Sequence, residues 1–239
     1  MQVIPVLDLL DGHVVHAVRG ERSRYRPIRS SLCATSEPVA VARALLRATG
    51  ARTLYVADLG AILERGAHVD ALAALCDALA ALCDALGQGV SIWLDAGFSD
   101  FASVRALFGA CGAGASLVPV FGTESLRDAG AIADAAAAGY EPVLSLDYHG
   151  GRALGSLHGD SARWPMRVIV MTLDQVGARA GPDLDTFAAV RGMAGERHLF
   201  GAGGVRDRSD LARASRAGAH GWLVGSAVHE LVLGGSALA

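Results

Sequence analysis

The chain alternates short apolar runs with longer alanine-rich segments, and this alternation limits the fold more than any other feature. An apolar strand followed by a helix-length connection is typical of parallel sheets, whose strands are buried on both faces. Eight such runs occur, at 3–7, 53–57, 90–94, 116–120, 142–146, 167–171, 198–200 and 221–224. Eight strand–helix units in 239 residues predict an α/β fold, a single-domain (β/α)8 TIM barrel over residues 1–239.

Helices are expected at 37–48, 69–86, 101–109, 125–138, 184–193 and 208–217. The connection after the fifth run is different, because 157–166 contains Gly159 and Pro165 and is too short for a full helix. We therefore expect the fifth helix to be shortened or missing. Its absence would leave an apolar strip on the barrel wall, a candidate surface for a homo-oligomer.

Charge and cysteine content exclude several classes of protein. The formal net charge is −3, which gives no electrostatic reason to expect a nucleic-acid or membrane partner. The four cysteines form no CxxC pair, so no zinc site or disulfide framework is indicated, and the eight histidines make no metal pattern. No apolar run approaches the roughly 20 residues needed to cross a bilayer, and we expect a cytoplasmic protein.

Two glycine-containing loops follow the last two predicted strands. Gly203 and Gly204 follow one strand, and Gly225 and Ser226 follow the next. Small residues between a strand and a helix start let backbone N–H groups converge on an anion. A lone Gly-Gly pair is more often turn chemistry. Two such loops in adjacent turns favour the phosphate site that barrels form after strands seven and eight.

The two halves of the sequence also resemble each other at four strand ends, in the same order. The matched pairs are Asp8 with Asp147, Gly97 with Gly204, Gly122-Thr123 with Gly225-Ser226, and Asp58 with Thr172. This order predicts a barrel built from two half-barrels. Each half would supply one carboxylate and one phosphate-sized loop to a shared mouth.

These residues carry a resemblance to a known family. The opening Ile4-Pro-Val-Leu-Asp-Leu-Leu-Asp-Gly12 and the closing Gly203-Gly-Val205 and Val224-Gly-Ser-Ala227 resemble the histidine-biosynthesis half-barrel proteins. The isomerase branch is more similar than the cyclase branch. The resemblance implies an Amadori-type aldose–ketose rearrangement of a ribosyl-amine with a phosphate at each end. It also implies that no metal or organic cofactor is used.

Paired carboxylates suit such a reaction, because one group must give a proton while another takes one. The resemblance implies that Asp8 is the base, that Asp147 is the acid and that Thr172 orients the sugar. A strand-end aspartate can instead cap the loop or helix that follows it. The symmetric pairing of Asp8 with Asp147 favours catalysis.

The sequence departs from the family after the third and fifth strands. Where the family carries Gly-Gly-Gly-Ile-Arg, this chain reads Asp95-Ala-Gly-Phe-Ser99. Asp95 would repel a phosphate and Phe98 would narrow its approach. The second phosphate loop, with Gly97, Gly122, Thr123 and Asp58, is therefore the weaker prediction. In the shortened crossover, Trp164 is either a relic of a substrate-binding tryptophan or a core plug, and we favour the plug.

The segment from Arg19 to Arg29 holds five arginines in eleven residues. The segment is either a lid that closes over an anionic ligand or a basic loop that is exposed to solvent. The segment is similar to a paralogous set of barrels found beside tetrahydromethanopterin-linked one-carbon genes. Three functions remain open: the isomerase, a paralogue with a different phosphorylated substrate in one-carbon metabolism, and a non-catalytic phosphate-binding barrel.

Overall fold

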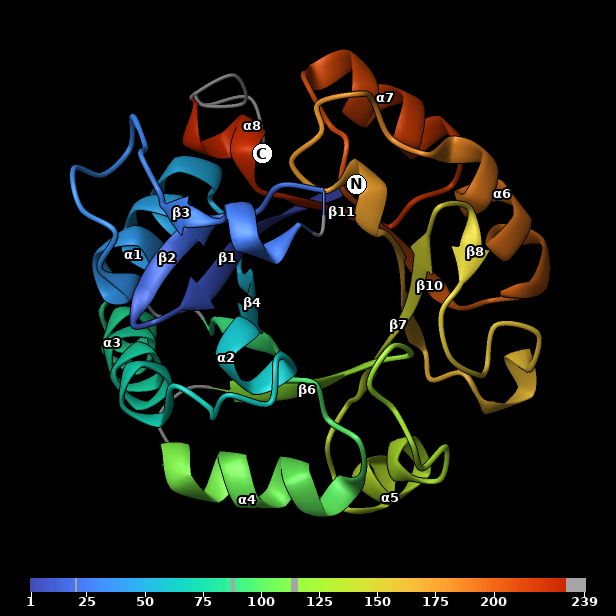
Figure 1. The fold of residues 1–239 in the computed structure, drawn as a ribbon, viewed down its shortest axis with the longest axis horizontal. Helices are drawn as coiled ribbons and strands as arrows, with labels where there is room; N and C mark the ends of the chain where they lie inside the picture. The colour runs from blue at the N-terminus through green and yellow to red at the C-terminus, as the bar shows by residue number, and fades with distance from the viewer. Residues whose placement is uncertain (20, 87–88, 113–115, 231–239) are drawn as a thin grey trace.

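The structure is a computed structural model that describes residues 1–19, 21–86, 89–112 and 116–230. Eight parallel strands form a closed barrel because the last one, β11, pairs with both β10 and β1 (Figure 1). The barrel strands are β1 (Gln2–Leu10), β4 (Thr53–Asp58), β5 (Ser91–Asp95), β6 (Ser116–Gly122), β7 (Val143–His149), β9 (Arg167–Thr172), β10 (His198–Ala202) and β11 (Gly221–Val224). The predicted (β/α)8 barrel is confirmed.

Three further strands lie antiparallel at the ends of barrel strands. β2 (His13–His16) pairs with β1, and β3 (Arg26–Pro27) pairs with β2. β8 (Arg152–Ala153) pairs with the end of β7. They extend the wall around the carboxyl-terminal mouth of the barrel.

Helices surround the barrel as a ring (Figure 1). The helices are α1 (Pro38–Thr49), α2 (Leu59–Ile62), α3 (Val69–Leu86), α4 (Phe101–Cys111), α5 (Ala131–Ala137), α6 (Leu184–Met193), α7 (Arg208–Arg216) and α8 (Ser226–His229). The short helix α2 is not part of the ring, because it lies inside it at the mouth of the barrel (Figure 1). α5 is shorter than the predicted 125–138, because the N–H groups of Arg127 and Asp128 both bond to the Ser99 carbonyl of the neighbouring loop. None of the helices in the described part of the chain is long and apolar enough to cross a membrane.

The crossover from β7 to β9 contains no α-helix, only the short 3-10 turn Ser161–Arg163 within a stretch that the structure describes in full. The missing fifth helix is therefore confirmed. Trp164 is 4% exposed and donates its indole N–H to the Leu157 carbonyl at 2.7 Å. It fills part of the space that a helix would occupy, as the core-plug interpretation predicts.

The strands alternate between two packed layers. One set of side chains fills the barrel interior, with one residue from each strand: Ile4, Tyr55, Trp93, Val118, Val143, Ile169, Phe200 and Leu223. The residues between them pack outward against the helices. Since side chains alternate along a strand, only every second residue reaches the mouth of the barrel.

The half-barrel symmetry is visible in the helix caps. Asp100 and Asp207 occupy equivalent loops, and each has a φ of −156°. Asp100 accepts the N–H of Ser103 at 2.8 Å, and Asp207 accepts the equivalent N–H of Asp210 at 3.1 Å. These caps begin α4 and α7 in the same way, so the backbones of the two halves remain equivalent.

Candidate active site

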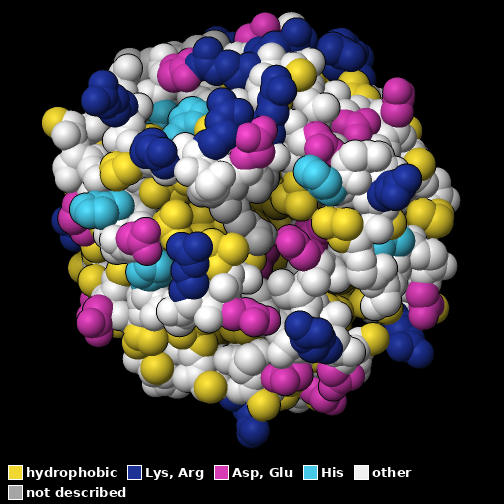
Figure 2. Space-filling view, viewed as in Figure 1, with side chains coloured by type: hydrophobic (Ala, Val, Ile, Leu, Met, Phe, Trp, Pro, Cys, Tyr) yellow, Lys and Arg dark blue, Asp and Glu magenta, His cyan; other side chains and the backbone are white. Residues whose placement is uncertain are grey.

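A cavity of about 340 Å³ lies at the carboxyl ends of the strands, where barrel chemistry takes place. Figure 2 shows this face of the molecule hollowed at its centre, with acidic side chains bordering the hollow. Asp8 of β1 and Asp147 of β7 both line the cavity, as do Gly203 and Ser226. The predicted carboxylate pair and the predicted phosphate loops therefore share one space, which we name the central cavity.

Asp8 faces the central cavity because it has the same inward alternation as Ile4 and Val6. Burial raises the pKa of its carboxyl to about 7. Its carboxylate accepts no hydrogen bond from the residues that the structure describes. An enclosed, unpartnered carboxyl with a pKa near 7 can take up or release a proton at neutral pH.

Asp147 is 6% exposed and is held by several donors. The Ser145 hydroxyl donates to Oδ1 at 2.7 Å, and the Glu124 backbone N–H donates to Oδ2 at 3.0 Å. The Thr123 hydroxyl lies 3.4 Å from the same Oδ2. Burial raises the pKa of Asp147 to about 7, against the opposing effect of the Glu124 N–H, and the charge of Asp95 raises it further.

Tyr55 and Asp95, which the sequence analysis did not assign to catalysis, line the same cavity as Asp8 and Asp147. The Tyr55 hydroxyl donates to Asp95 Oδ2 at 3.0 Å, and both residues line the central cavity. Burial raises the pKa of Tyr55 well above its usual value, and the charges of Asp95, Asp147 and Asp8 add to the effect. Three carboxylates thus lie near one tyrosine hydroxyl.

Gly122 makes room for two of these carboxylates. A Cβ at this position would lie 3.0 Å from Asp147 Oδ2 and 3.6 Å from Asp95 Oδ2. Both oxygens therefore approach the same point beside the glycine, where a side chain would displace them. Gly122 thus has a steric role beside the carboxylates, and its expected part in a phosphate loop stays a prediction.

The loop after β10 is shaped by close backbone approach. Gly204 has a φ of +81°, and a Cβ there would lie 2.0 Å from the Gly181 carbonyl oxygen. Its N–H donates to the Gln175 carbonyl at 2.9 Å. Gly203, Gly204, Gly225 and Ser226 all line the central cavity, so the structure brings the predicted phosphate-loop residues together.

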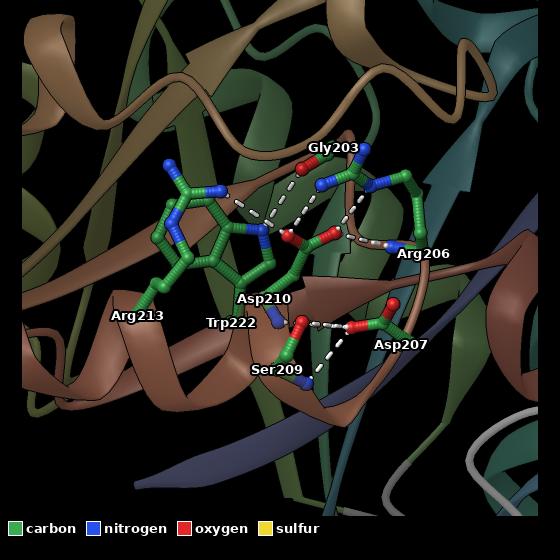
Figure 3. Close-up of polar contacts among 7 residues, drawn as sticks. All are labelled: Gly203, Arg206, Asp207, Ser209, Asp210, Arg213 and Trp222. Atoms are coloured by element: carbon green, nitrogen blue, oxygen red, sulfur yellow. Dashed lines mark hydrogen bonds and ion pairs between the residues drawn. The ribbon is translucent and has the colours of Figure 1, made fainter.

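A polar network behind this loop fixes its position (Figure 3). The Trp222 indole N–H donates to the Gly203 carbonyl at 3.0 Å. Asp210 is fully buried and accepts the Arg206 backbone N–H at 3.0 Å, together with its guanidinium at 2.8 and 2.9 Å. The Arg206 guanidinium holds the pKa of Asp210 below its usual value.

Basic side chains line the same end of the cavity. His16 Nε2 lies 3.4 Å from the Ser226 hydroxyl, and Arg179 pairs with Glu230. Burial lowers the pKa of His16, and the nearby Arg179 charge lowers it further. Burial also lowers the pKa of His229 to about 4. The cavity therefore has an acidic end at Asp95 and, at Ser226, an end lined by two histidines whose pKa values are lowered and by Arg179.

Comparison with known proteins places the chain in a family. The family model described as "Histidine biosynthesis protein" matches residues 2–233 of this chain. The chain belongs to the histidine biosynthesis protein family.

Two relatives illustrate the range of this histidine biosynthesis family. An uncharacterized protein of Methanocaldococcus jannaschii is 26% identical over 236 residues, covering 98% of this chain and 95% of the relative. The 1-(5-phosphoribosyl)-5-((5-phosphoribosylamino)methylideneamino)imidazole-4-carboxamide isomerase of Myxococcus xanthus is 29% identical over 254 residues, covering 100% of this chain and 98% of the relative. The family and the whole-chain resemblance inferred from the motifs are both confirmed.

Three residues that the sequence analysis expected at the site do not line the central cavity. Their positions in the strand alternation direct their side chains outward, away from the barrel interior. Asp58 is fully buried and bonds His68 Nδ1 at 2.7 Å and the Ala61 N–H at 3.2 Å as the cap of α2. The Thr172 hydroxyl donates toward Asp183 at 3.4 Å, in the layer of α6. Thr123 reaches the site only through Asp147. Asp58, Thr123 and Thr172 therefore do not line the cavity, and their expected contacts with substrate stay predictions.

The loop after β5, where the resemblance implies a second phosphate site, is closed by contacts within the protein. The Gly97 N–H donates to Asp95 Oδ1 at 3.1 Å, and a Cβ on Gly97 would lie 3.0 Å from Ile62 Cα. Ile62 lines the central cavity and Gly97 does not. The expectation that Phe98 narrows the phosphate approach is wrong, since Phe98 is 2% exposed and packs outward against Phe108 and Phe121.

The arginine-rich segment contributes its apolar residues to the cavity wall. Tyr25 and Ile28 line the cavity, whereas Arg19 is exposed and does not. The Arg19 N–H donates to the Val176 carbonyl at 2.7 Å. The expected contact between Arg19 and a ligand stays a prediction, and among the described residues Arg179 is the arginine that lines this space. The described residues include no group of three His, Cys, Asp or Glu side chains arranged to hold a metal ion.

Proposed function

We propose that the protein is an aldose–ketose isomerase that performs an Amadori-type rearrangement on a phosphorylated ribosyl-amine metabolite. The observation that carries this proposal is the pair Asp8 and Asp147. Both carboxyls line one cavity, and burial raises the pKa of each to about 7. Relatives named as isomerases over nearly the whole chain give further support.

The proposed chemistry divides two proton transfers between these carboxyls. Protonated Asp147 gives a proton to the ring oxygen of the aminoaldose, and the ring opens to an iminium. Ionised Asp8 then removes the proton from C2, which leaves an enolamine that tautomerises to the aminoketose. Asp8 suits the base because no donor in the described chain stabilises its negative charge, whereas Asp147 is held in place by Ser145 and Glu124.

The phosphate of the substrate would anchor the sugar at Gly203, Gly204, Gly225 and Ser226, the turns that follow β10 and β11. Ser226→Asp places a carboxylate there and is expected to abolish binding of inorganic phosphate. Unchanged phosphate affinity in this variant would place the anion elsewhere.

The test of the catalytic pair uses Asp8→Asn and Asp147→Asn in the purified protein. Turnover of the imidazole-carboxamide ribotide substrate is followed by NMR in D₂O, which detects solvent deuterium at C1 of the aminoketose, the carbon that takes up a proton when the enolamine tautomerises. Each substitution is expected to remove turnover. The matched control is Asp11→Asn, because Asp11 is exposed, three residues from Asp8, and has a φ of +49° that asparagine tolerates. Turnover that survives both site substitutions refutes the paired mechanism.

A second candidate is a paralogue that acts on a different phosphorylated substrate, for which tetrahydromethanopterin-linked one-carbon metabolism is the proposed setting. The closed loop at Gly97 favours a changed substrate. Absence of turnover on the ribotide, together with Asp8-dependent deuterium exchange in another sugar phosphate, would support this candidate. Phosphate binding without exchange in any sugar phosphate would support a non-catalytic barrel.

A further inference from the structure

We infer that the ligand of the central cavity carries a single phosphate, at Gly204 and Ser226, and at its other end a protonated amine that lies among Asp8, Asp95 and Asp147. The inference rests on the phosphate end of the proposed function but not on the isomerase chemistry. It places a positively charged group of the ligand, rather than a second phosphate, at the acidic end of the cavity.

The loop glycine at the acidic end does not reach the cavity, because Gly203 and Gly204 line it and Gly97 does not. The Gly97 N–H is used by Asp95, as described above, and the loop after β6 is closed in the same way. Thr123 N–H donates to the Ser145 carbonyl at 2.9 Å, and Glu124 N–H donates to Asp147. The N–H groups of Ser125 and Leu126 both donate to the Gly122 carbonyl. The Gly204 N–H is also bonded within the protein, so the two ends differ in the side chains that line them: small residues at Gly203, Gly204 and Ser226, and carboxylates at Asp95, Glu124 and Asp147.

The same end presents acceptors in an enclosed space. Asp95 and Asp147 approach one point beside Gly122, and Glu124 also lines the wall. Asp8 adds a half-buried carboxyl that lines the cavity and has no hydrogen-bond partner in the described chain. Such a carboxyl can accept a donor from the ligand, and a protonated amine supplies three.

The opposite end fixes the direction of the ligand. His16, Arg179 and Ser226 line the cavity where the predicted phosphate loops meet. Basic side chains also gather across the top of the view in Figure 2, while acidic ones border the hollow. A ligand with an anion at one end and a cation at the other matches this arrangement, whereas a bisphosphate meets carboxylates at its second phosphate.

The test measures binding rather than turnover, with two sugar phosphates that differ at one group. Glucosamine 6-phosphate carries an amine where glucose 6-phosphate carries a hydroxyl. We expect the amine to bind on the order of tenfold more tightly by calorimetry at about pH 7. Fructose 1,6-bisphosphate is expected to bind more weakly than either compound. In Asp95→Asn the preference for the amine should fall toward one, while inorganic phosphate binds as it does in the wild type.

The control is again Asp11→Asn, which should keep the full preference for the amine. A bisphosphate that binds more tightly than both monophosphates overturns the inference, as does an equal affinity for the amine and the hydroxyl compound. An amine preference that survives Asp95→Asn also overturns it. Loss of inorganic phosphate binding in Ser226→Asp tests the phosphate end separately, so a failure at one end is distinguishable from a failure at the other.

Proton release gives an independent readout. An ammonium beside Asp8 and Asp147 favours their ionised forms, and at about pH 6 both carboxyls are mostly protonated because their pKa values lie at about 7. Binding of glucosamine 6-phosphate should therefore release protons, seen as a dependence of the binding enthalpy on the buffer. Proton uptake would contradict the placement of the amine.

Discussion

Asp8→Asn is expected to stabilise the protein at alkaline pH and to do so much less at acidic pH. Burial raises the pKa of Asp8 from 3.8 to about 7. Because the folded-state pKa lies above the unfolded value, the wild type loses stability as the pH rises from about 4 to about 7. Asparagine has nearly the shape of the protonated acid and carries no charge at any of these pH values. Asp8 is the clearer test of the two carboxyls, since asparagine at 147 would also disturb the Ser145 and Glu124 bonds.

The pKa shift gives the size of the effect. At about pH 8 the ionisation of Asp8 in the unfolded chain lowers wild-type stability by up to about 4 kcal/mol relative to the neutral variant. At about pH 4.5 the same term is about 1 kcal/mol. Both figures are upper limits, because Asp8 borders a cavity that water can enter. The difference between the two pH values is therefore at most about 3 kcal/mol.

Urea denaturation of wild type, Asp8→Asn and Asp11→Asn at both pH values measures this difference. The Asp8 variant should gain stability over wild type mainly at the higher pH, and the Asp11 variant should show no pH-dependent gain. A gain of equal size at both pH values would show that the Asp8 carboxyl titrates normally in the folded protein. In that case the argument for a carboxyl active near neutrality would fail.

Three other predictions follow from the same site and its surroundings. The rate of deuterium exchange should peak near pH 7 and fall on both sides, because one carboxyl of the pair must be ionised and the other protonated; a flat profile would contradict it. Gly122→Ala should lower kcat by about tenfold to a hundredfold with the fold retained, since the new Cβ displaces the Asp147 carboxylate; unchanged kinetics would refute the steric role. Gly109→Ala, in an exposed turn of α4 with open space around it, should raise the free energy of unfolding by about 0.5–1 kcal/mol and leave the kinetics unchanged; a loss of stability in urea would contradict this.

The sequence predicted the barrel but not which strand-end residues face its mouth. Eight apolar runs were sufficient for the fold, because each run overlaps a strand of the structure. The sequence did not show which side chains point into the barrel and which point outward. A strand that is buried on both faces has no alternation of apolar and polar residues, and Leu54, Tyr55, Val56 and Ala57 are all apolar. Asp58 and Thr172 were therefore assigned to the site although both face the helices.

A signal for the missed residues was present in the register. Once Asp8 and Asp147 are taken as inward, counting by two along the paired strands places Tyr55 and Asp95 inward as well. Arg179 and His16 had no such signal, because they come from a loop and an added strand that only tertiary packing brings to Ser226. Side chains on barrel strands were thus within reach of sequence reasoning, and side chains on loops were not.

The divergence of the two half-barrels can be traced to one pair of equivalent positions. Asp95 precedes Ala96-Gly97 in the first half, and Ala202 precedes Gly203-Gly204 in the second; both residues line the central cavity. Only the aspartate can accept the N–H of the loop that follows it, and only the aspartate brings charge to that end. Asp95→Ala makes the two halves alike at this position, freeing the Gly97 N–H and removing the repulsion. Affinity for fructose 1,6-bisphosphate, measured by calorimetry, should then rise above that of the wild type while affinity for inorganic phosphate stays the same. If bisphosphate affinity does not change, the charge of Asp95 is not what excludes the second phosphate, and the packing of Ile62 against Gly97 must account for it.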